Sequence, residues 1–261
     1  MQHRKIDASD RYGYFGIDSN RPSKDPLVKL PRLFLCSLAL ALTPMAPLAA
    51  FAQTGAGRLA AAPVETSIAG IPYALDRQAP DGAVAVSGGE LRLSAAKGTD
   101  LYANADGSKI VDDTPRVLFA PRGDFIFSAR IQAAFNSDFD GAALLVYAGK
   151  AMWGKVLFER MPDGSNAVTT TINQGKGDDA LHQQVAGNVV HLKVARRGAV
   201  YVFYLSGDGI AWRMLRTFAL PADQPVRVGF SAQSPKGERF TAHFSDLRWR
   251  ARGFDNYWQG E

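Results

Sequence analysis

The chain has 261 residues, of which 46% are hydrophobic and 10% aromatic, with a formal net charge of +5 and one cysteine. That hydrophobic fraction is ordinary for a folded globular protein and excludes a disordered or collagen-like chain. A single cysteine excludes a disulfide framework within the chain. Composition alone assigns no reaction.

Residues 1–52 have the features of a secretory signal peptide. Residues 33–43 (LFLCSLALALT) form a short apolar run behind two basic residues, and Ala50-Phe51-Ala52 matches an A-x-A cleavage site. A membrane anchor is the alternative, but prolines interrupt the run and a span needs about 20 apolar residues. We expect cleavage after Ala52 and export to the periplasm or the extracellular space, without membrane association afterwards. Because residues 1–26 are long and polar for a leader, we also expect a true start nearer the apolar run.

The charge of the working protein is lower than the whole sequence indicates. Residues 1–52 contain seven Lys/Arg and four Asp/Glu, so the remaining 209 residues carry a formal charge of +2. Nucleic-acid binding requires a concentrated basic face, whereas the basic residues here form only scattered pairs such as Arg196-Arg197. We therefore expect no nucleic-acid partner, and the sequence assigns no oligomeric state.

The sequence predicts one all-β domain over residues 64–250, after an Ala/Gly-rich linker at residues 53–63. Short β-rich runs alternate with turn signals such as Asp163-Gly164 and Asp208-Gly209, whose residues tolerate the positive φ of tight hairpins. About eleven antiparallel strands at this spacing favour a β-sandwich or jelly roll. The expected strands are residues 90–95, 116–119, 124–135, 140–148, 152–161, 166–174, 189–196, 199–206, 210–219, 225–234 and 239–249.

Four groups of segments carry a resemblance to a known family. They are residues 98–102 (GTDLY), residues 140–146 with 153–159 (DGAALLV and WGKVLFE), residues 204–212 (YLSGDGIAW), and the closing segments 225–230, 234–237 and 244–247. In order and spacing they resemble the bacterial and fungal family of concanavalin A-like sandwiches labelled "regulation of enolase". The resemblance implies a concanavalin A-like β-sandwich with no settled activity, and fold does not imply function. Since enolase is cytosolic, the label does not fit an exported chain.

The strand at residues 152–161 carries the most suggestive side chains. Alternate residues of a strand share a face, so Trp153, Lys155 and Glu159 should project together while Val156 and Phe158 point into the core. A ring, an ammonium and a carboxylate on a concave sheet face suit a sugar, which offers an apolar face and hydroxyl groups. The alternative is an ordinary outer face with an exposed tryptophan and a Lys–Glu pair of little energetic value.

Three further residues are expected around this face. Tyr102 stands where the resembling family has a tryptophan, so it retains a ring. Asn173 would reach the same surface if residues 166–174 pair back through the Asp163-Gly164 turn. Asp179 lies in residues 174–180, which we expect to form a loop; Ala180 there replaces an aromatic residue of the family pattern.

Other carboxylates offer little for catalysis. A glycosidase needs two carboxyl groups facing one cleft, but the E-x-D-x-x-E strand motif of related glucanases is missing and residues 53–261 contain only five glutamates. Asp138 and Asp140 lie in a segment that reads as an Asx-rich turn, with a structural calcium site as the alternative. We expect no other cofactor, because the histidines lack metal-ligand spacing.

The C-terminal tail, residues 251–261, places three aromatic residues within five positions. It is expected either to fold back on the sandwich or to contact a partner or a sugar. Taken together, the residues favour an exported glycan-binding or accessory domain that is not catalytic. The alternatives are a glycoside-active enzyme using Glu159 with a loop aspartate, and a structural envelope protein.

Overall fold

The computed structural model describes residues 67–221 and 223–261, which belong to one compact unit, Val64–Glu261. The expected signal peptide (1–52) and linker (53–63) lie outside the described residues. Within the described part, the all-β prediction is confirmed. The strands are β1 (Asp76–Gln78), β2 (Val84–Ser87), β3 (Glu90–Ala96), β4 (Leu101–Ala103), β5 (Ile110–Asp112), β6 (Arg116–Phe119), β7 (Phe125–Ala133), β8 (Gly141–Gly149), β9 (Met152–Arg160), β10 (Asn166–Gln174), β11 (Gly177–Val185), β12 (Val189–Arg197), β13 (Val200–Ser206), β14 (Arg213–Ala219), β15 (Arg227–Gln233) and β16 (Arg239–Arg250).

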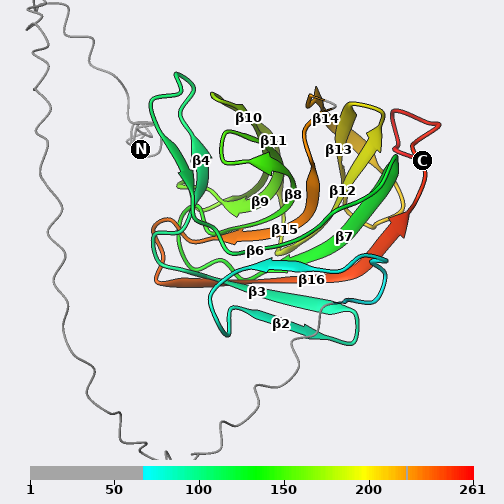
Figure 1. Cartoon of the computed structure of the whole chain (residues 1–261). Helices are drawn as coiled ribbons and strands as arrows, with labels where there is room; N and C mark the ends of the chain where they lie inside the picture. The colour runs from blue at the N-terminus through cyan, green and yellow to red at the C-terminus, as the bar shows by residue number, and fades with distance from the viewer. Residues whose placement is uncertain (1–66, 222) are drawn as a thin grey trace, which may run out of the picture. The chain divides into compact units, whose positions relative to one another are not determined.

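The strands form two seven-stranded antiparallel sheets and one small hairpin (Figure 1). Sheet I has the order β1-β6-β15-β8-β9-β10-β11, and sheet II has the order β14-β13-β12-β7-β16-β3-β2. Strands β4 and β5 pair only with each other. In the part of the chain that the structure describes, no helix is long and apolar enough to cross a membrane.

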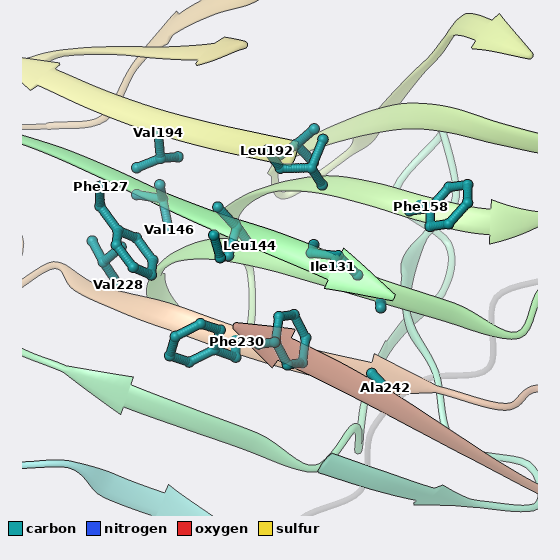
Figure 2. Close-up of a cluster of buried hydrophobic side chains, with 14 of the residues drawn as sticks. Phe127, Ile131, Leu144, Val146, Phe158, Leu192, Val194, Val228, Phe230 and Ala242 are labelled. Carbon is teal, nitrogen blue, oxygen red and sulfur yellow. The ribbon is translucent and has the colours of Figure 1, made fainter. Parts of the chain in front are cut away.

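The two sheets pack face to face over one apolar core, because alternate side chains of each central strand point inward. Figure 2 shows this layer: Leu144 and Val146 come from β8 of sheet I, and Leu192 and Val194 from β12 of sheet II. Phe127 of β7 packs edge-on against Phe230 of β15, with ring centroids 5.4 Å apart. Val156 and Phe158 of β9, the two residues that the sequence predicted to point into the core, belong to this layer.

Each sheet is also partly covered on its outer face. The β4–β5 hairpin lies on sheet I, where Leu101 and Ala103 pack into a second apolar cluster. The C-terminal segment, residues 251–261, lies on sheet II beside β12 and β13 (Figure 1), and Phe254 packs there in a third apolar cluster. The tail therefore folds back on the sandwich, which is one of the two expected arrangements.

The main correction to the expected elements concerns residues 174–180, which we expected to form a loop. Only a tight turn at Gly175 and Lys176 separates β10 from β11, and Asp178, Asp179 and Ala180 lie within β11. Its sequence, GDDALHQQV, is polar because β11 is an edge strand with mostly exposed side chains. Short strands β1, β2, β4 and β5 were also not predicted, since three or four residues carry too little periodicity.

Candidate functional site

The predicted candidate site lies on β9, and its alternation is as expected. Val156 and Phe158 point into the inter-sheet core, whereas Trp153 belongs to the cluster on the outer face of sheet I. The exposure is not as expected: Trp153 and Glu159 are 0% exposed and Lys155 is 2% exposed. The alternative interpretation of an ordinary outer face with an exposed tryptophan is therefore wrong.

Trp153 supports the β4–β5 hairpin. It packs with Leu101 and Ala103 of β4 and with Leu145 of β8, and its Nε1 donates a hydrogen bond of 3.1 Å to the Lys150 carbonyl. Because the indole lies under the hairpin, it provides a packing surface for β4 and is not presented to a sugar ring in this structure.

The ammonium of Lys155 lies where β4 crosses sheet I. It donates to the Leu101 carbonyl at 2.5 Å and to Gln233 Oε1 at 2.9 Å, and it lies 5.7 Å from the centre of the Trp153 ring. At one end of β4, Thr99 bridges Ser234 after β15. A buried ammonium needs such acceptors, since burial without them is costly.

At its other end, β4 approaches the start of β11. Gly177 donates its backbone N–H to the Asn104 carbonyl. A Cβ at Gly177 would overlap the Ala103 carbonyl, so only glycine permits this approach. The hairpin thus crosses the outer face of sheet I and divides it into an apolar half, which contains Trp153, and a polar half.

We define the polar half as Glu159, Thr169, Thr171 and Asp179. Thr169 Oγ1 donates to Glu159 Oε1 at 2.7 Å, and the Thr171 hydroxyl donates to the Asp179 carboxylate. The glutamate and both threonines are buried, whereas Asp179 is exposed. Hydrogen bonds between neighbouring strands therefore fix the orientation of these polar groups.

A buried ion pair anchors the other strand of the hairpin. Arg116 Nη2 lies 2.5 Å from Asp112 Oδ1 of β5, and the Tyr147 hydroxyl donates to Asp112 Oδ2 at 2.7 Å. Burial and this hydrogen bond raise the pKa of the Tyr147 phenol. The hairpin is thus held by Arg116 of β6 and Tyr147 of β8, both in sheet I, as well as by Lys155 of β9.

The remaining predicted residues are spread around β4. Asn173 is buried and donates to the Lys150 carbonyl at 3.3 Å, the acceptor that Trp153 also uses. Tyr102 is half-buried and, by alternation, projects from the face of β4 opposite Leu101. Asp179 lies at the exposed end of the polar half. In the strand register Asn173 pairs with Trp153, and Asp179 pairs with Thr171, two residues from Asn173. The structure therefore places Asp179 nearer to Asn173 than to Glu159.

Asp140 anchors its own loop. Its Oδ2 accepts the backbone N–H groups of Asn136 and Ser137 at 3.0 and 2.9 Å, and its Oδ1 accepts the Ser234 hydroxyl at 2.7 Å. Asp138 is half-buried in the same loop. Among the described residues, no group of three or more His, Cys, Asp and Glu side chains is placed to hold a metal ion. Calcium binding at this loop stays a prediction.

The two carboxylates of the polar half are far apart. In the strand register, Ala167 pairs with Glu159 on one side, and Thr171 pairs with Asp179 on the other. Asp179 is thus two strands and four residues away from Glu159, or about 16 Å between Cα atoms at the usual strand spacings. Glycosidase carboxyl pairs lie about 5–9.5 Å apart, so these two residues do not form one.

Sequence reasoning missed a second buried lysine, on the opposite sheet. Lys193 of β12 is 2% exposed and lies 4.1 Å from the centre of the Trp212 ring. Its alternation with Leu192 and Val194 predicts only an outward-facing residue, and no local signal shows that the tail covers it.

Similar solved structures share the fold. A functionally unknown protein from Saccharomyces cerevisiae matches with a TM-score of 0.61 and 20% identity over 67% of this chain and 95% of its own. A Bacteroides ovatus xyloglucan PUL GH43B matches with a TM-score of 0.56 and 16% identity over 71% of this chain. A bifunctional GH43-CE from Bacteroides eggerthii matches with a TM-score of 0.52 and 16% identity over 70% of this chain. The chain spans 38% and 24% of these two GH43 proteins.

Comparison of sequences identifies the family. No curated protein matches the chain. A family model matches residues 78–252, nearly the whole sandwich, and its description names no activity. The "regulation of enolase" label therefore stays a prediction. The chain belongs to the family described as "Protein of unknown function (DUF1349)".

Proposed function

We propose that this protein is an exported, non-catalytic glycan-binding or accessory domain, and that its ligand lies along the polar half of sheet I. The observation that carries the proposal is the fixed orientation of buried polar side chains on an outer sheet face. Glu159 and Thr171 are 0% and 4% exposed. Protein atoms cover both side chains, so they orient their neighbours, and the exposed Asp179 is the group of the polar half that a ligand can reach.

Preorganised polar groups are what sugar recognition requires. A ligand site uses a few placed polar groups to fix orientation, and binding is tighter when those groups need no further ordering. The threonine hydroxyls already hold Glu159 and Asp179. Tyr102, on the face of β4 opposite the apolar cluster, offers a half-exposed ring on the hairpin that crosses this face.

The fold likeness supports the proposal only in a general way. The titles of two similar structures name GH43 proteins, one of them from a xyloglucan locus, and the chain spans only part of each. A domain of this fold thus occurs inside proteins named as glycoside hydrolases. That association favours a role beside carbohydrate-active enzymes.

The geometry disfavours the enzyme alternative. The carboxylates of the polar half lie too far apart for a glycosidase pair. Asp140 is engaged by two backbone donors of its own loop and by the Ser234 hydroxyl after β15. Asp140 also precedes Gly141, which pairs with Glu159, so alternation directs Asp140 away from the face of Glu159.

A glycan array tests the proposal with the protein as its host processes and exports it. Wild type is compared with Asp179→Ala and Glu159→Gln, and Glu90→Gln, an exposed glutamate on sheet II, is the matched control. We expect one class of neutral glycan to bind wild type and Glu90→Gln. Binding should fall about tenfold or more in Asp179→Ala, the loss expected for one or two hydrogen bonds to a charged group. It should fall less in Glu159→Gln, because the buried Glu159 acts by orienting Thr169.

A reducing-sugar assay on the same glycans separates binding from catalysis. Product release that Glu159→Gln abolishes would replace the proposal with the enzyme alternative. Binding that survives both site variants would show that the ligand does not bind on the polar half. No binding on the array would favour the alternative of a structural envelope protein.

A further inference from the structure

The outer face of sheet II contains a cavity of about 250 Å³, on the side of the sandwich opposite the polar half. Its floor follows the strand register: Ser128 of β7 pairs with Lys193 of β12 on one side and with Arg248 of β16 on the other. Arg250 and Trp212 also line the cavity. A volume of this size accommodates one sugar ring, below the range of about 300–1,000 Å³ typical of larger ligands.

The lining of the cavity has an excess of positive charge. Lys193, Arg248 and Arg250 line it, and Glu261 is the only acidic side chain among its described lining residues. Arg248 and Arg250 are exposed. Arg248 donates from Nε and Nη2 to the Asp246 carboxylate, at 3.0 Å each, so its Nη1 is the atom that it offers to a ligand beside Arg250. Planar guanidinium groups bind carboxylates with two parallel hydrogen bonds.

A carboxylate already occupies this cavity. Glu261 Oε1 accepts from Lys193 Nζ at 2.7 Å, and Glu261 Oε2 accepts from Arg250 Nη1 at 2.5 Å. Lys193 also donates to the Gln259 and Gly260 carbonyls, and burial lowers its pKa. The chain's own C-terminal segment thus shows which anion the cavity selects and which groups hold it.

The walls of the cavity suit a sugar ring. The half-buried indole of Trp212 forms one wall, and Ile210 at the rim is 82% exposed. The connecting turn is rigid, because Asp208 Oδ1 accepts the backbone N–H groups of Ile210 and Ala211. An aromatic and an aliphatic surface beside two arginines match a ring with an apolar face and one carboxylate.

We propose that this cavity binds a uronic-acid residue of an acidic glycan. The ligand's carboxylate takes the place of the Glu261 carboxylate on Arg250 and is held also by Arg248, while its ring lies against Trp212. The proposal goes beyond the neutral-glycan site on sheet I and stands independently of it, because no residue is shared between the two sites.

The test is isothermal titration of the exported protein with trigalacturonate and with its carboxyl-reduced trisaccharide. We expect saturable binding of trigalacturonate at least about tenfold tighter than that of the reduced form, the difference for one charge-assisted contact. Arg248→Ala should bind trigalacturonate about tenfold more weakly than wild type does. Arg92→Ala, which removes an exposed arginine of the same sheet face outside the cavity, should bind like wild type.

A third variant tests the displacement of the tail. Glu261→Gln removes the competing carboxylate, so trigalacturonate should bind more tightly than to wild type. Unchanged or weaker binding to Glu261→Gln would show that the ligand does not displace the tail. An equal loss of affinity in Arg248→Ala and Arg92→Ala would show that binding depends only on the overall positive charge and not on this cavity. Equal affinity for triaspartate would overturn the sugar assignment.

The two sites are distinguished by crossed variants. Asp179→Ala should leave trigalacturonate binding unchanged, and Arg248→Ala should leave the neutral-glycan signal on the array unchanged. Failure of the neutral glycan with retained trigalacturonate binding would reject the proposed function alone, and the reverse pattern would reject this inference alone.

Discussion

Each outer face of the sandwich has a buried lysine beside a tryptophan, and a different segment of the chain covers that lysine on each face. On sheet I, Lys155 lies beside Trp153 and donates to a carbonyl of the β4–β5 hairpin. On sheet II, Lys193 lies beside Trp212 and donates to carbonyls of the C-terminal segment. Both lysines are 2% exposed. We refer to these as the hairpin site and the tail site.

The difference lies in how each covering segment is held. The hairpin continues into strands at both ends and packs its own apolar residues on Trp153. The tail follows β16, and its contacts include the carboxylate of Glu261 as well as carbonyls. Both segments are held partly through a carboxylate, but that of Asp112 in the hairpin is 9% exposed, whereas that of Glu261 in the tail is 39% exposed. We therefore expect the hairpin site to be rigid and the tail site to be adjustable.

The largest expected effect comes from removing the two tryptophans. Trp153→Ala should lower the free energy of unfolding by about 3–5 kcal/mol, because a fully buried ring leaves a cavity. Trp212→Ala should cost only about 1–2 kcal/mol, since its ring is half-buried and already borders a cavity. Urea denaturation measures both. Equal losses would contradict the distinction between a rigid and an adjustable site.

Substituting the glycine at each covering contact should show the same difference between the hairpin site and the tail site. Gly177→Ala places a Cβ against the Ala103 carbonyl and should destabilise the whole domain by about 1–3 kcal/mol. Gly260 has a φ of +63°, and a Cβ there would lie 2.7 Å from the Tyr204 ring. Gly260→Ala should therefore loosen mainly residues 251–261. Hydrogen exchange resolves the two patterns; a global change from Gly260→Ala would show that the tail supports the entire sandwich.

The tail site should also respond to acid. Burial alone would raise the pKa of Glu261, but hydrogen bonds from Lys193 and Arg250 outweigh it and lower that pKa. A lowered folded-state pKa means that the stabilisation is present above the unfolded value of about 4.3 and is lost as the pH falls through the folded value. Amide exchange of residues 251–261 should therefore rise below about pH 4. The Glu261→Gln variant should lack the transition.

The smallest effect concerns the turn that borders the tail site. Hydrogen bonds from the backbone N–H groups of Ile210 and Ala211 lower the pKa of Asp208 to about 2. Asp208 should therefore remain charged while Glu261 titrates, so the turn keeps its shape as the tail loosens. Carboxyl carbon NMR titration measures both groups. Simultaneous titration of Asp208 and Glu261 would show that turn and tail respond as one unit.

Much of the fold could be predicted because strand periodicity is local. The alternation of β9 correctly separated Val156 from Trp153, and turn residues such as Asp163-Gly164 correctly marked hairpins. The polar edge strand β11 was missed, because its exposed side chains resemble those of a loop. Periodicity reports burial on the core side of a strand and carries no information about what covers its outer side.

The candidate site shows the same division. The sequence by itself determined which residues of β9 share a face, that the chain is all-β, and where its hairpins turn. Only the tertiary structure decided that β4 covers Trp153, and that Glu261 reaches Lys193 across 68 residues of chain. Such contacts depend on packing between distant segments, whereas side-chain alternation depends only on the pleat of a single strand.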